Sequence, residues 1–280
     1  MDTIIGLGTA GCNVARSFSA FPQYKVYLID SKESDEKKYF RVQPQDSPEL
    51  YESSCPSVKR FLARITKDVL FVVNGASDIS AITLSILQQI HHKSNINVLY
   101  VQPDASLLNE KKRLLERTVR HVLQEYTRSG VFEKMFLVSN DSVEGCMQEV
   151  PLRNYYGELN QMISATFHGI NVFNHIDSVT DTFSGPAIGN RICTIGLLDP
   201  TTGEEKMFFP LDSPNETRYY YGMSEKQIDE DKTLRKKIIT QIKGKNINKN
   251  KISYGIYSTE YDTNYGYVVS YSSQIQLDIK

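Results

Sequence analysis

Apolar runs alternate with amphipathic segments over the first half of the chain. Val, Ile and Leu dominate the apolar runs, as is typical of parallel strands that are covered on both faces. These runs open the chain and recur at residues 25–30, 68–74, 97–102 and 134–139. Between them, apolar residues three and four positions apart predict helices. The helices are expected over residues 13–21, from about 56, from about 80 to 91, and over 107–129. This alternation predicts an α/β fold with a parallel sheet.

The pattern changes after a predicted long helix over residues 152–169. Beyond it, short tyrosine-rich runs favour strands, and they surround one charged helix over residues 225–243. The strands are expected at residues 191–198, 206–211, 217–222, 251–260 and 265–276. We therefore expect a Rossmann-like domain over residues 1–151, a central bridging helix and loop over 152–178, and a smaller α+β domain over 179–280.

Three glycines separate the opening strand from the first helix with G-x-G-x-x-G spacing, at Gly6, Gly8 and Gly11. In such a turn the first glycine permits a tight bend, the second lets backbone approach a ligand, and the third lets the helix pack on the strand. The helix N-terminus then presents free N–H groups to an anion. The turn predicts a nucleotide-type site, and the alternative is a tight turn that binds nothing.

Two further features bear on what such a site would bind. The strand at residues 68–74 is followed by a second strand–loop–helix turn of a size that suits an anion, at residues 75–80. Asp30 ends the strand at residues 25–30, about where a Rossmann protein holds the acid that binds a ribose. An NAD(P)- or adenine-nucleotide-dependent Rossmann enzyme is therefore one alternative, although no catalytic pair is evident downstream.

Composition narrows the partners and the compartment. The 280 residues carry a formal net charge of −1, so no overall field attracts the chain to nucleic acid or an anionic membrane. No apolar run approaches the length of a membrane span, and no leader pattern precedes the first strand. The four cysteines form no C-x-x-C pair and the five histidines no ligand cluster, which predicts no metal site and reduced thiols in a cytoplasm.

The order of these features resembles the tubulin/FtsZ superfamily over nearly the whole chain. The first turn matches the FtsZ pattern G-x-G-G-x-G-x-N, with Thr9 in place of one glycine and with Asn13 at its end. The resemblance implies GTP or GDP as the ligand, with Mg²⁺ as a candidate companion ion. It also implies phosphate-binding residues in both turns. These are Gly6, Gly8, Thr9, Ala10, Gly11, Cys12 and Asn13 in the first turn, and Gly75, Ala76, Ser77 and Ser80 in the second.

Other positions match the contacts of the family to sugar and base. Arg113 fits an arginine that contacts the sugar region, and its acidic partner falls on Asn109 or, one residue out of register, on Glu110. Tyr156 and Asn160 share one helix face, and they match an aromatic that stacks on guanine and an amide or acid that hydrogen-bonds its edge. The alternatives are a solvated helix charge for Arg113, and core packing and a cap for the other two.

Two departures from the family pattern weaken the expected chemistry. The signature loop G-G-G-T-G-T/S-G reads Gly75-Ala-Ser-Asp-Ile-Ser-Ala81 here, so side chains, including the Asp78 carboxylate, stand where bare backbone would approach phosphates. The motif N-x-D-x-x-D after the bridging helix aligns with Asn174 and Asp177, so one of two water-activating carboxylates is missing. The alternative role for Asp177 is to cap a helix predicted from about residue 178.

The resemblance implies a cytoskeletal protein that binds GTP and assembles head to tail with itself, with slow or lost GTPase activity. Such a contact does not close on itself and therefore generates filaments. We expect no FtsZ-type C-terminal adaptor peptide, because the sequence stops just after the last predicted strand. Besides the Rossmann enzyme, the remaining alternative is a structural scaffold of the same fold that binds no nucleotide.

Overall fold

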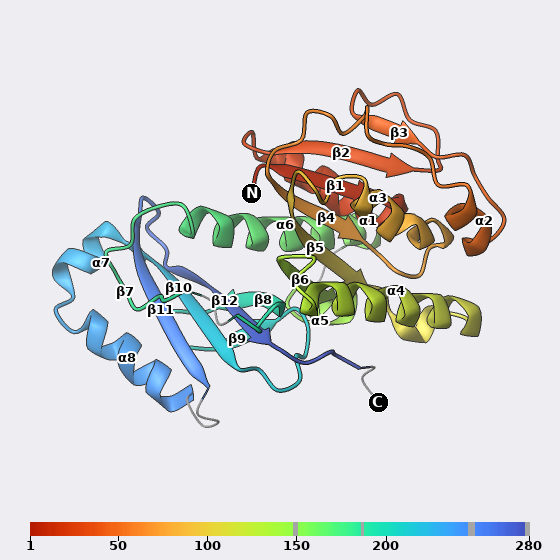
Figure 1. Ribbon diagram of the computed structural model, residues 1–280. Coiled ribbons are helices and arrows are strands. Elements are labelled where there is room, and N and C mark those ends of the chain that lie inside the picture. Colours follow the sequence, from red (N-terminus) through yellow and green to blue (C-terminus); the bar gives the residue numbers. More distant parts are fainter. Residues whose placement is uncertain (148–150, 186–187, 246–249, 278–280) are drawn as a thin grey trace.

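One continuous mixed sheet forms the centre of the molecule (Figure 1). The computed structural model describes residues 1–147, 151–185, 188–245 and 250–277. From one edge the strands are β3 (Tyr39–Arg41), β2 (Lys25–Asp30), β1 (Thr3–Leu7), β4 (Asp68–Val73), β5 (Asn95–Gln102), β6 (Lys134–Ser139), β8 (Ile192–Leu198), β12 (Tyr265–Ser272), β10 (Glu216–Ser224), β11 (Lys251–Thr259) and β7 (Thr180–Asp181), with β9 (Glu205–Met207) beside β8. The strands from β3 to β6 are all parallel; the sequence predicts five of them, and β3 was not predicted.

Helices cover both faces of the parallel part of the sheet (Figure 1). Adjacent residues on one strand point into different cores: Leu70 joins the core beneath α1 (Gly8–Ser17), α5 (Asn140–Glu144) and α6 (Tyr155–Phe173). Phe71 joins the core beneath α2 (Pro48–Ser53), α3 (Thr83–Gln88) and α4 (Glu110–Arg128). On the C-terminal strands a third apolar cluster lies beneath α7 (Glu225–Glu230) and α8 (Leu234–Lys245).

The long helix α6 runs between the parallel strands and the C-terminal strands. Near its C-terminal end, the ring of Phe173 stacks on that of Tyr257 with 4.4 Å between centroids. Gly169 is required at this contact, because a Cβ atom there would overlap the ring of Tyr267. The helix is therefore packed against both halves of the chain.

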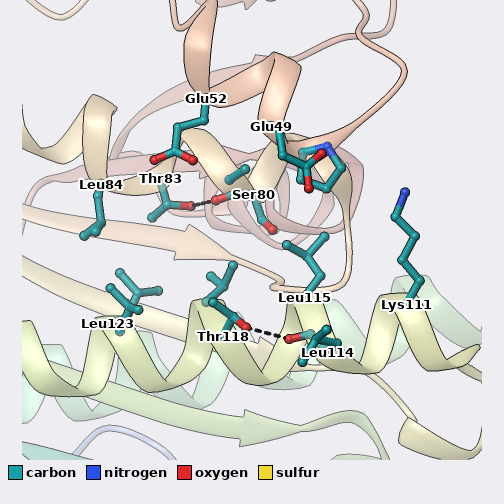
Figure 2. A pocket seen from close by; sticks show the side chains of 14 residues that line it. Glu49, Glu52, Ser80, Thr83, Leu84, Lys111, Leu114, Leu115, Thr118 and Leu123 are labelled. Carbon is teal, nitrogen blue, oxygen red and sulfur yellow. Dashed lines mark hydrogen bonds between the residues drawn. The ribbon is translucent and has the colours of Figure 1, made fainter.

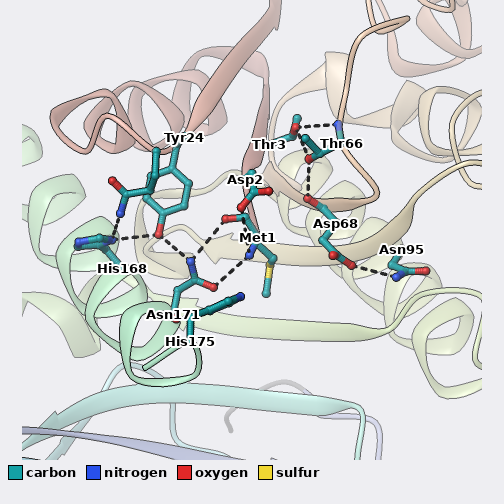
Figure 3. Close-up of polar contacts among 11 residues, drawn as sticks. Met1, Asp2, Thr3, Tyr24, Thr66, Asp68, Asn95, His168, Asn171 and His175 are labelled. Atoms are coloured by element: carbon teal, nitrogen blue, oxygen red, sulfur yellow. Dashed lines mark hydrogen bonds and ion pairs between the residues drawn. The ribbon is translucent and has the colours of Figure 1, made fainter. Parts of the chain in front are cut away.

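Polar contacts fix the same end of α6 to the start of the chain (Figure 3). The amino group of Met1, which precedes β1, donates to Oδ1 of Asn171 at 3.2 Å. Asn171 Nδ2 donates to the hydroxyl of Tyr24 at 3.1 Å, and that hydroxyl lies 3.0 Å from Nδ1 of His168. The C-terminal end of α6 therefore lies where the parallel strands begin, at the end of the sheet opposite to the carboxyl ends of these strands.

A second polar contact joins the segment after β12 to α4. Gln276 is only 1% exposed, and its backbone N–H donates to Oε1 of Gln124 at 2.7 Å. Its carbonyl oxygen accepts hydrogen bonds from Nη1 of Arg120, at 2.8 Å, and from Gln124. Because Arg120 also pairs with Glu116 at 2.9 Å, the middle of α4 is held by buried polar groups.

The helix predicted from about residue 56 is wrong. Residues 59–64 form turns, and the nearest helix is α2, which begins at Pro48 with Ser47 as its cap. Val58 is nevertheless fully buried in the apolar core, and the side chain of Gln89 accepts from its N–H and donates to the carbonyl of Pro56. A distant side chain thus bonds the backbone at the start of this segment, which keeps one helix-type bond, from the N–H of Leu62 to the carbonyl of Val58, but does not continue as a helix.

Other predicted elements also differ, and of the strand expected at residues 206–211 only β9 (Glu205–Met207) forms. The charged helix over residues 225–243 is interrupted between α7 and α8. Asp231 accepts from the N–H and hydroxyl of Thr233, which gives a local alternative to helical bonding. The first helix begins earlier than predicted, at Gly8 rather than Asn13, so the glycine turn is itself the first turn of α1.

Candidate functional site

The first turn places an uncapped helix N-terminus directly after β1. Leu7, at the cap position of α1, is extended and offers no side-chain acceptor, and Gly8 has φ +71°, which favours glycine. The N–H groups of the first helical turn have no intrahelical partner, so Gly8, Thr9 and Ala10 present donors and the positive end of the helix dipole. This arrangement suits an anion.

Gly6 and Gly11 serve the packing of α1 on the sheet. A Cβ atom on Gly6 would lie 2.6 Å from the carbonyl oxygen of Gly11, and one on Gly11 would lie 2.6 Å from that of Val72 in β4. Both are shorter than real Cβ contacts, so only glycine fits. The predicted role of the third glycine in packing helix on strand agrees with this geometry.

The two side chains at the end of the pattern do not form a ligand surface on their own. Cys12 is fully buried, its thiol lies 3.4 Å from the carbonyl oxygen of Gly6, and burial raises the thiol pKa to about 12. Asn13 is exposed, and its Oδ1 accepts from Nη1 of Arg16 at 2.7 Å. Arg16 in turn pairs with Glu36. The thiol of Cys12 faces the core, and only its backbone belongs to the turn.

Both carboxylate oxygens of Asp30 accept hydrogen bonds from neighbouring residues of the chain. Asp30 is 4% exposed, Oδ2 accepts from the hydroxyl of Thr9 at 3.0 Å, and Oδ1 accepts from the N–H of Ser31 at 2.8 Å. A ribose would have to displace these contacts. The Rossmann-enzyme alternative therefore loses the residue on which it depended, and Thr9 gains a role in joining α1 to the end of β2.

The second turn follows β4 and lies beside the first, because Leu7 pairs with Val73. Its polar groups are largely used within the turn: Oδ1 of Asn74 accepts from the N–H of Ala76 at 3.0 Å. Ser80 is 1% exposed and its hydroxyl donates to the carbonyl of Gly75 at 2.9 Å. The N–H of Ala76 and the hydroxyl of Ser80 are therefore both used within the turn, and a phosphate role for these two residues stays a prediction.

Gly75 is also explained by packing. A Cβ atom there would overlap the hydroxyl of Tyr100. That hydroxyl is buried and donates to Oε1 of Glu116 at 2.9 Å, and burial raises the pKa of Tyr100 well above its usual value. Of the turn, Ser77 is exposed and Asp78 is partly exposed.

A polar cavity of about 340 Å³ opens between the two turns. Both turns and two neighbouring segments contribute to its wall. Its lining is Thr9, Ala10, Gln45, Tyr51, Asn74, Ala76, Ser77, Asp78, Ile79, Leu108 and Lys112. Of the predicted turn residues, Thr9, Ala10, Ala76 and Ser77 line it, and Gln45, Tyr51, Leu108 and Lys112 join them without having been predicted. The position of Lys112 in the first turn of the helix after β5 was the available signal, whereas Gln45 and Tyr51 carry no motif.

A second cavity of about 490 Å³ lies at the ends of β5 and β6 and shares Leu108 with the first. Arg113 lines it, and its Nε donates to the carbonyls of Ala105 and Leu108 at 3.0 Å each. Asn109 caps α4 by accepting from the N–H of Lys112, so it is a cap and not a free sugar ligand. Arg113 therefore lines a hollow and is oriented by backbone oxygens, and whether a sugar binds there stays a prediction.

Tyr156 and Asn160 line neither cavity. Tyr156 is 64% exposed, which excludes core packing, and its ring contacts that of Tyr155 at 5.0 Å. Tyr155, not Tyr156, is tied to α5, because its hydroxyl donates to Glu144 at 2.7 Å. Whether Tyr156 and Asn160 contact a base stays a prediction.

The loop after α6 lies at the opposite edge of the sheet from both cavities, as the Met1–Asn171 contact requires. Oδ1 of Asn174 accepts from the hydroxyl of Tyr220 at 3.0 Å, and Asp177 is exposed. The helix predicted from residue 178 is absent, and β7 begins at Thr180, so the capping role for Asp177 is wrong. Asn174 and Asp177 cannot reach the cavities of their own chain.

A separate, mainly apolar groove of about 440 Å³ lies between α2, α3 and α4 (Figure 2). Leu84, Leu115 and Leu123 face it, with Glu49 and Lys111 at its borders. It lies on a helical face of the sheet and not at the strand ends, so it is distinct from the two polar cavities.

The fold resembles solved structures over almost the full chain. CetZ2 from Haloferax volcanii, described as a GTPγS-bound protofilament, matches with a TM-score of 0.74 at 13% identity, covering 96% of this chain and 92% of CetZ2. TubZ from Bacillus thuringiensis serovar israelensis, described as GDP-form protofilaments, matches at 0.72 and 12% identity, covering 96% and 83%. An empty FtsZ dimer from M. jannaschii matches at 0.69 and 11% identity, covering 99% and 93%.

No protein-family model matches the sequence, and no curated protein matches it. The fold is therefore established by structure alone, and the chain has the tubulin/FtsZ fold that the order of its motifs predicted. Within the described ranges no helix is both long enough and apolar enough to cross a membrane.

Proposed function

We propose that this chain binds a guanine nucleotide in the two polar cavities and assembles head to tail with copies of itself in the cytoplasm. The observation that carries the proposal is an uncapped helix N-terminus that opens into a polar cavity at the carboxyl edge of a tubulin/FtsZ-type sheet. Two structures with this fold are described as protofilaments with GTPγS or GDP. Residues 1–151 then form the nucleotide-binding domain, residues 152–178 the bridge, and residues 179–280 the second domain.

In this proposal the phosphates lie against the first turn of α1, and the sugar lies beside Arg113 in the second cavity. Tyr156 and Asn160 approach the base from the start of α6. The described residues contain no group of three or more His, Cys, Asp or Glu side chains that could hold a metal ion. Mg²⁺ would therefore be held chiefly by phosphate oxygens, with the Asp78 carboxylate in the cavity lining, and would neutralise phosphate charge.

Head-to-tail assembly follows from the placement of the loop after α6. That loop and the cavities lie at opposite edges of the sheet, so stacking two copies in the same orientation brings Asp177 of one toward the cavity of the next. Large apolar side chains are exposed near both edges: Leu107 is 78% and Leu152 is 89% exposed on the cavity side, and Val179 is 54% exposed near Asp177. Such side chains suit a contact that buries them.

Turnover is expected to be slow. Asp177 is one carboxylate at the position where the family uses two, and Asn174 can orient water but cannot accept its proton. The hydrogen bond from Tyr220 further restrains Asn174. The chain then spends most of its time with nucleotide bound and unhydrolysed.

Assembly can be tested by right-angle light scattering and negative-stain electron microscopy of the purified chain with GTP, GTPγS, GDP or no nucleotide. We expect filaments with GTP or GTPγS and slow phosphate release with GTP. A matched variant, Gly8→Val, should form none. If the wild-type chain binds no nucleotide in a fluorescence titration and forms no polymer under any condition, the proposal is wrong and a scaffold without a ligand replaces it.

A further inference from the structure

The polar cavity contains a lysine that no motif assigns. Lys112 lies in the first turn of α4 and lines the cavity together with Thr9 and Ala10 of the α1 N-terminus. Within the described part of the chain, its ammonium group has no hydrogen-bond or ion-pair partner. An exposed cation beside an uncapped helix N-terminus adds to the positive potential of the same hollow.

Three consecutive basic side chains at the start of α4 point to three different places. Lys111 borders the apolar groove between α2 and α4 (Figure 2). Arg113 lines the second cavity and is held by two backbone carbonyls. Only Lys112 of this run lines the polar cavity between the turns. Successive residues on a helix are about 100° apart, which is why neighbours in sequence face different hollows.

The second turn offers a phosphate fewer hydrogen-bond donors than a glycine-rich loop would offer. The N–H of Ala76 is taken by Asn74, the N–H of Ser80 by the carbonyl of Ser77, and the hydroxyl of Ser80 by Gly75. Asp78 adds a negative charge to the cavity wall. A phosphate group in this cavity therefore finds fewer donors on the side of β4, chiefly exposed Ser77, and a cation is the chemical group that would compensate.

We propose that Lys112 binds the phosphate end of the nucleotide and compensates for the donors that the second turn uses within itself. The inference rests on the proposed nucleotide-binding function and specifies how this chain achieves it. The ligand is a nucleoside di- or triphosphate, because the lysine would gain nothing from a nucleoside without phosphates. Lys suits the role as a compact charge on a flexible stem.

The test compares Lys112→Ala with Lys111→Ala, which removes the same charge one residue away but from the other groove. Each variant is titrated with N-methylanthraniloyl-GTP and then with unlabelled guanosine as competitor. We expect Lys112→Ala to weaken binding of the labelled GTP by roughly 10- to 100-fold, as for loss of a hydrogen bond to a charged group. Lys111→Ala should bind like wild type, Lys112→Arg should recover most of the affinity, and the affinity for guanosine should be the same in all four proteins.

Two results would overturn the proposal, and they can be told apart. If the wild-type chain binds the labelled GTP and the two alanine variants bind it equally well, the lysine assignment is wrong while the proposed function stands. If the wild-type chain binds no nucleotide, both are wrong. Thermal unfolding of each variant shows that the loss of affinity is not a loss of fold, since both lysines are exposed.

Discussion

The two strand-to-helix turns at the ends of β1 and β4 are neighbours in the sheet but treat their backbone in opposite ways. The first leaves the amides of Gly8, Thr9 and Ala10 open at a helix N-terminus. The second uses Asn74 and Ser80 to satisfy its own polar groups. The glycines do not distinguish the two turns. Gly75 in the second turn and Gly11 in the first are both required by packing, so a glycine here does not indicate a backbone that is open to a ligand. The second turn thus keeps the strand–loop–helix arrangement while it uses hydrogen-bond donors within itself.

The largest expected effect comes from Gly11→Ala. The added Cβ would lie 2.6 Å from a backbone oxygen of β4, so α1 must move away from the sheet. We expect the free energy of unfolding to fall by about 3 kcal/mol, as in overpacked cores. Urea unfolding measures it, with Gly157→Ala in α6 as the control. That glycine has no atom within 4 Å of an added Cβ, and the substitution should stabilise by about 0.5–1 kcal/mol.

The next effect separates the site from the fold. Gly8→Val forces a branched side chain into φ +71° and places a Cβ 3.0 Å from Ile79, at the mouth of the cavity. Nucleotide affinity should fall by at least about 30-fold, equivalent to about 2 kcal/mol. The control is Gly130→Val, which has a similar φ of +87° but lies after α4. If both variants lose affinity equally in a fluorescence titration, strain and not the cavity explains the result.

Ser80→Ala tests the second turn. Removing the buried hydroxyl leaves the carbonyl of Gly75 without its partner, so the free energy of unfolding should fall by about 1–2 kcal/mol. Nucleotide affinity should change less than threefold, because this hydroxyl does not face the cavity. Chemical unfolding and nucleotide titration are measured on the same samples, with exposed Ser77→Ala as the control for stability. A large loss of affinity with unchanged stability would restore the family role for Ser80.

The smallest expected effect is that of Asp78→Asn. Removing the carboxylate from the cavity wall should strengthen nucleotide binding a few-fold when Mg²⁺ is chelated, because one repulsion is lost at a solvated site. With Mg²⁺ present the gain should disappear. Glu49→Gln removes the same charge from the apolar groove and should change neither value. Weaker binding of Asp78→Asn without Mg²⁺ would contradict a repulsive role.

Much of the fold could be predicted because its signals are local. The parallel strands and the long helix α6 follow from apolar runs and periodicity, and the structure confirms them. The predicted helix from residue 56 failed because Gln89, more than 30 residues away in sequence, bonds the backbone of Pro56 and Val58. No local pattern reports such a contact.

The candidate site was predictable in its backbone and not in its side chains. The glycine spacing located the first turn, and two predicted residues from each turn line one cavity, Thr9 and Ala10 from the first and Ala76 and Ser77 from the second. What the sequence did not show is the direction in which each side chain points. That direction buries the thiol of Cys12, turns the hydroxyl of Ser80 to the carbonyl of Gly75, and places Lys112 in the lining of the cavity. That direction is set by packing between segments distant in the sequence.

Gln276 joins the segment after β12 to α4, the helix that borders both cavities. It is buried against the middle of α4, where Arg120 and Gln124 hold its backbone, while the first turn of the same helix borders both cavities. The positions of Lys112 and Arg113 at the two cavities therefore depend on a helix that is anchored to the segment after β12.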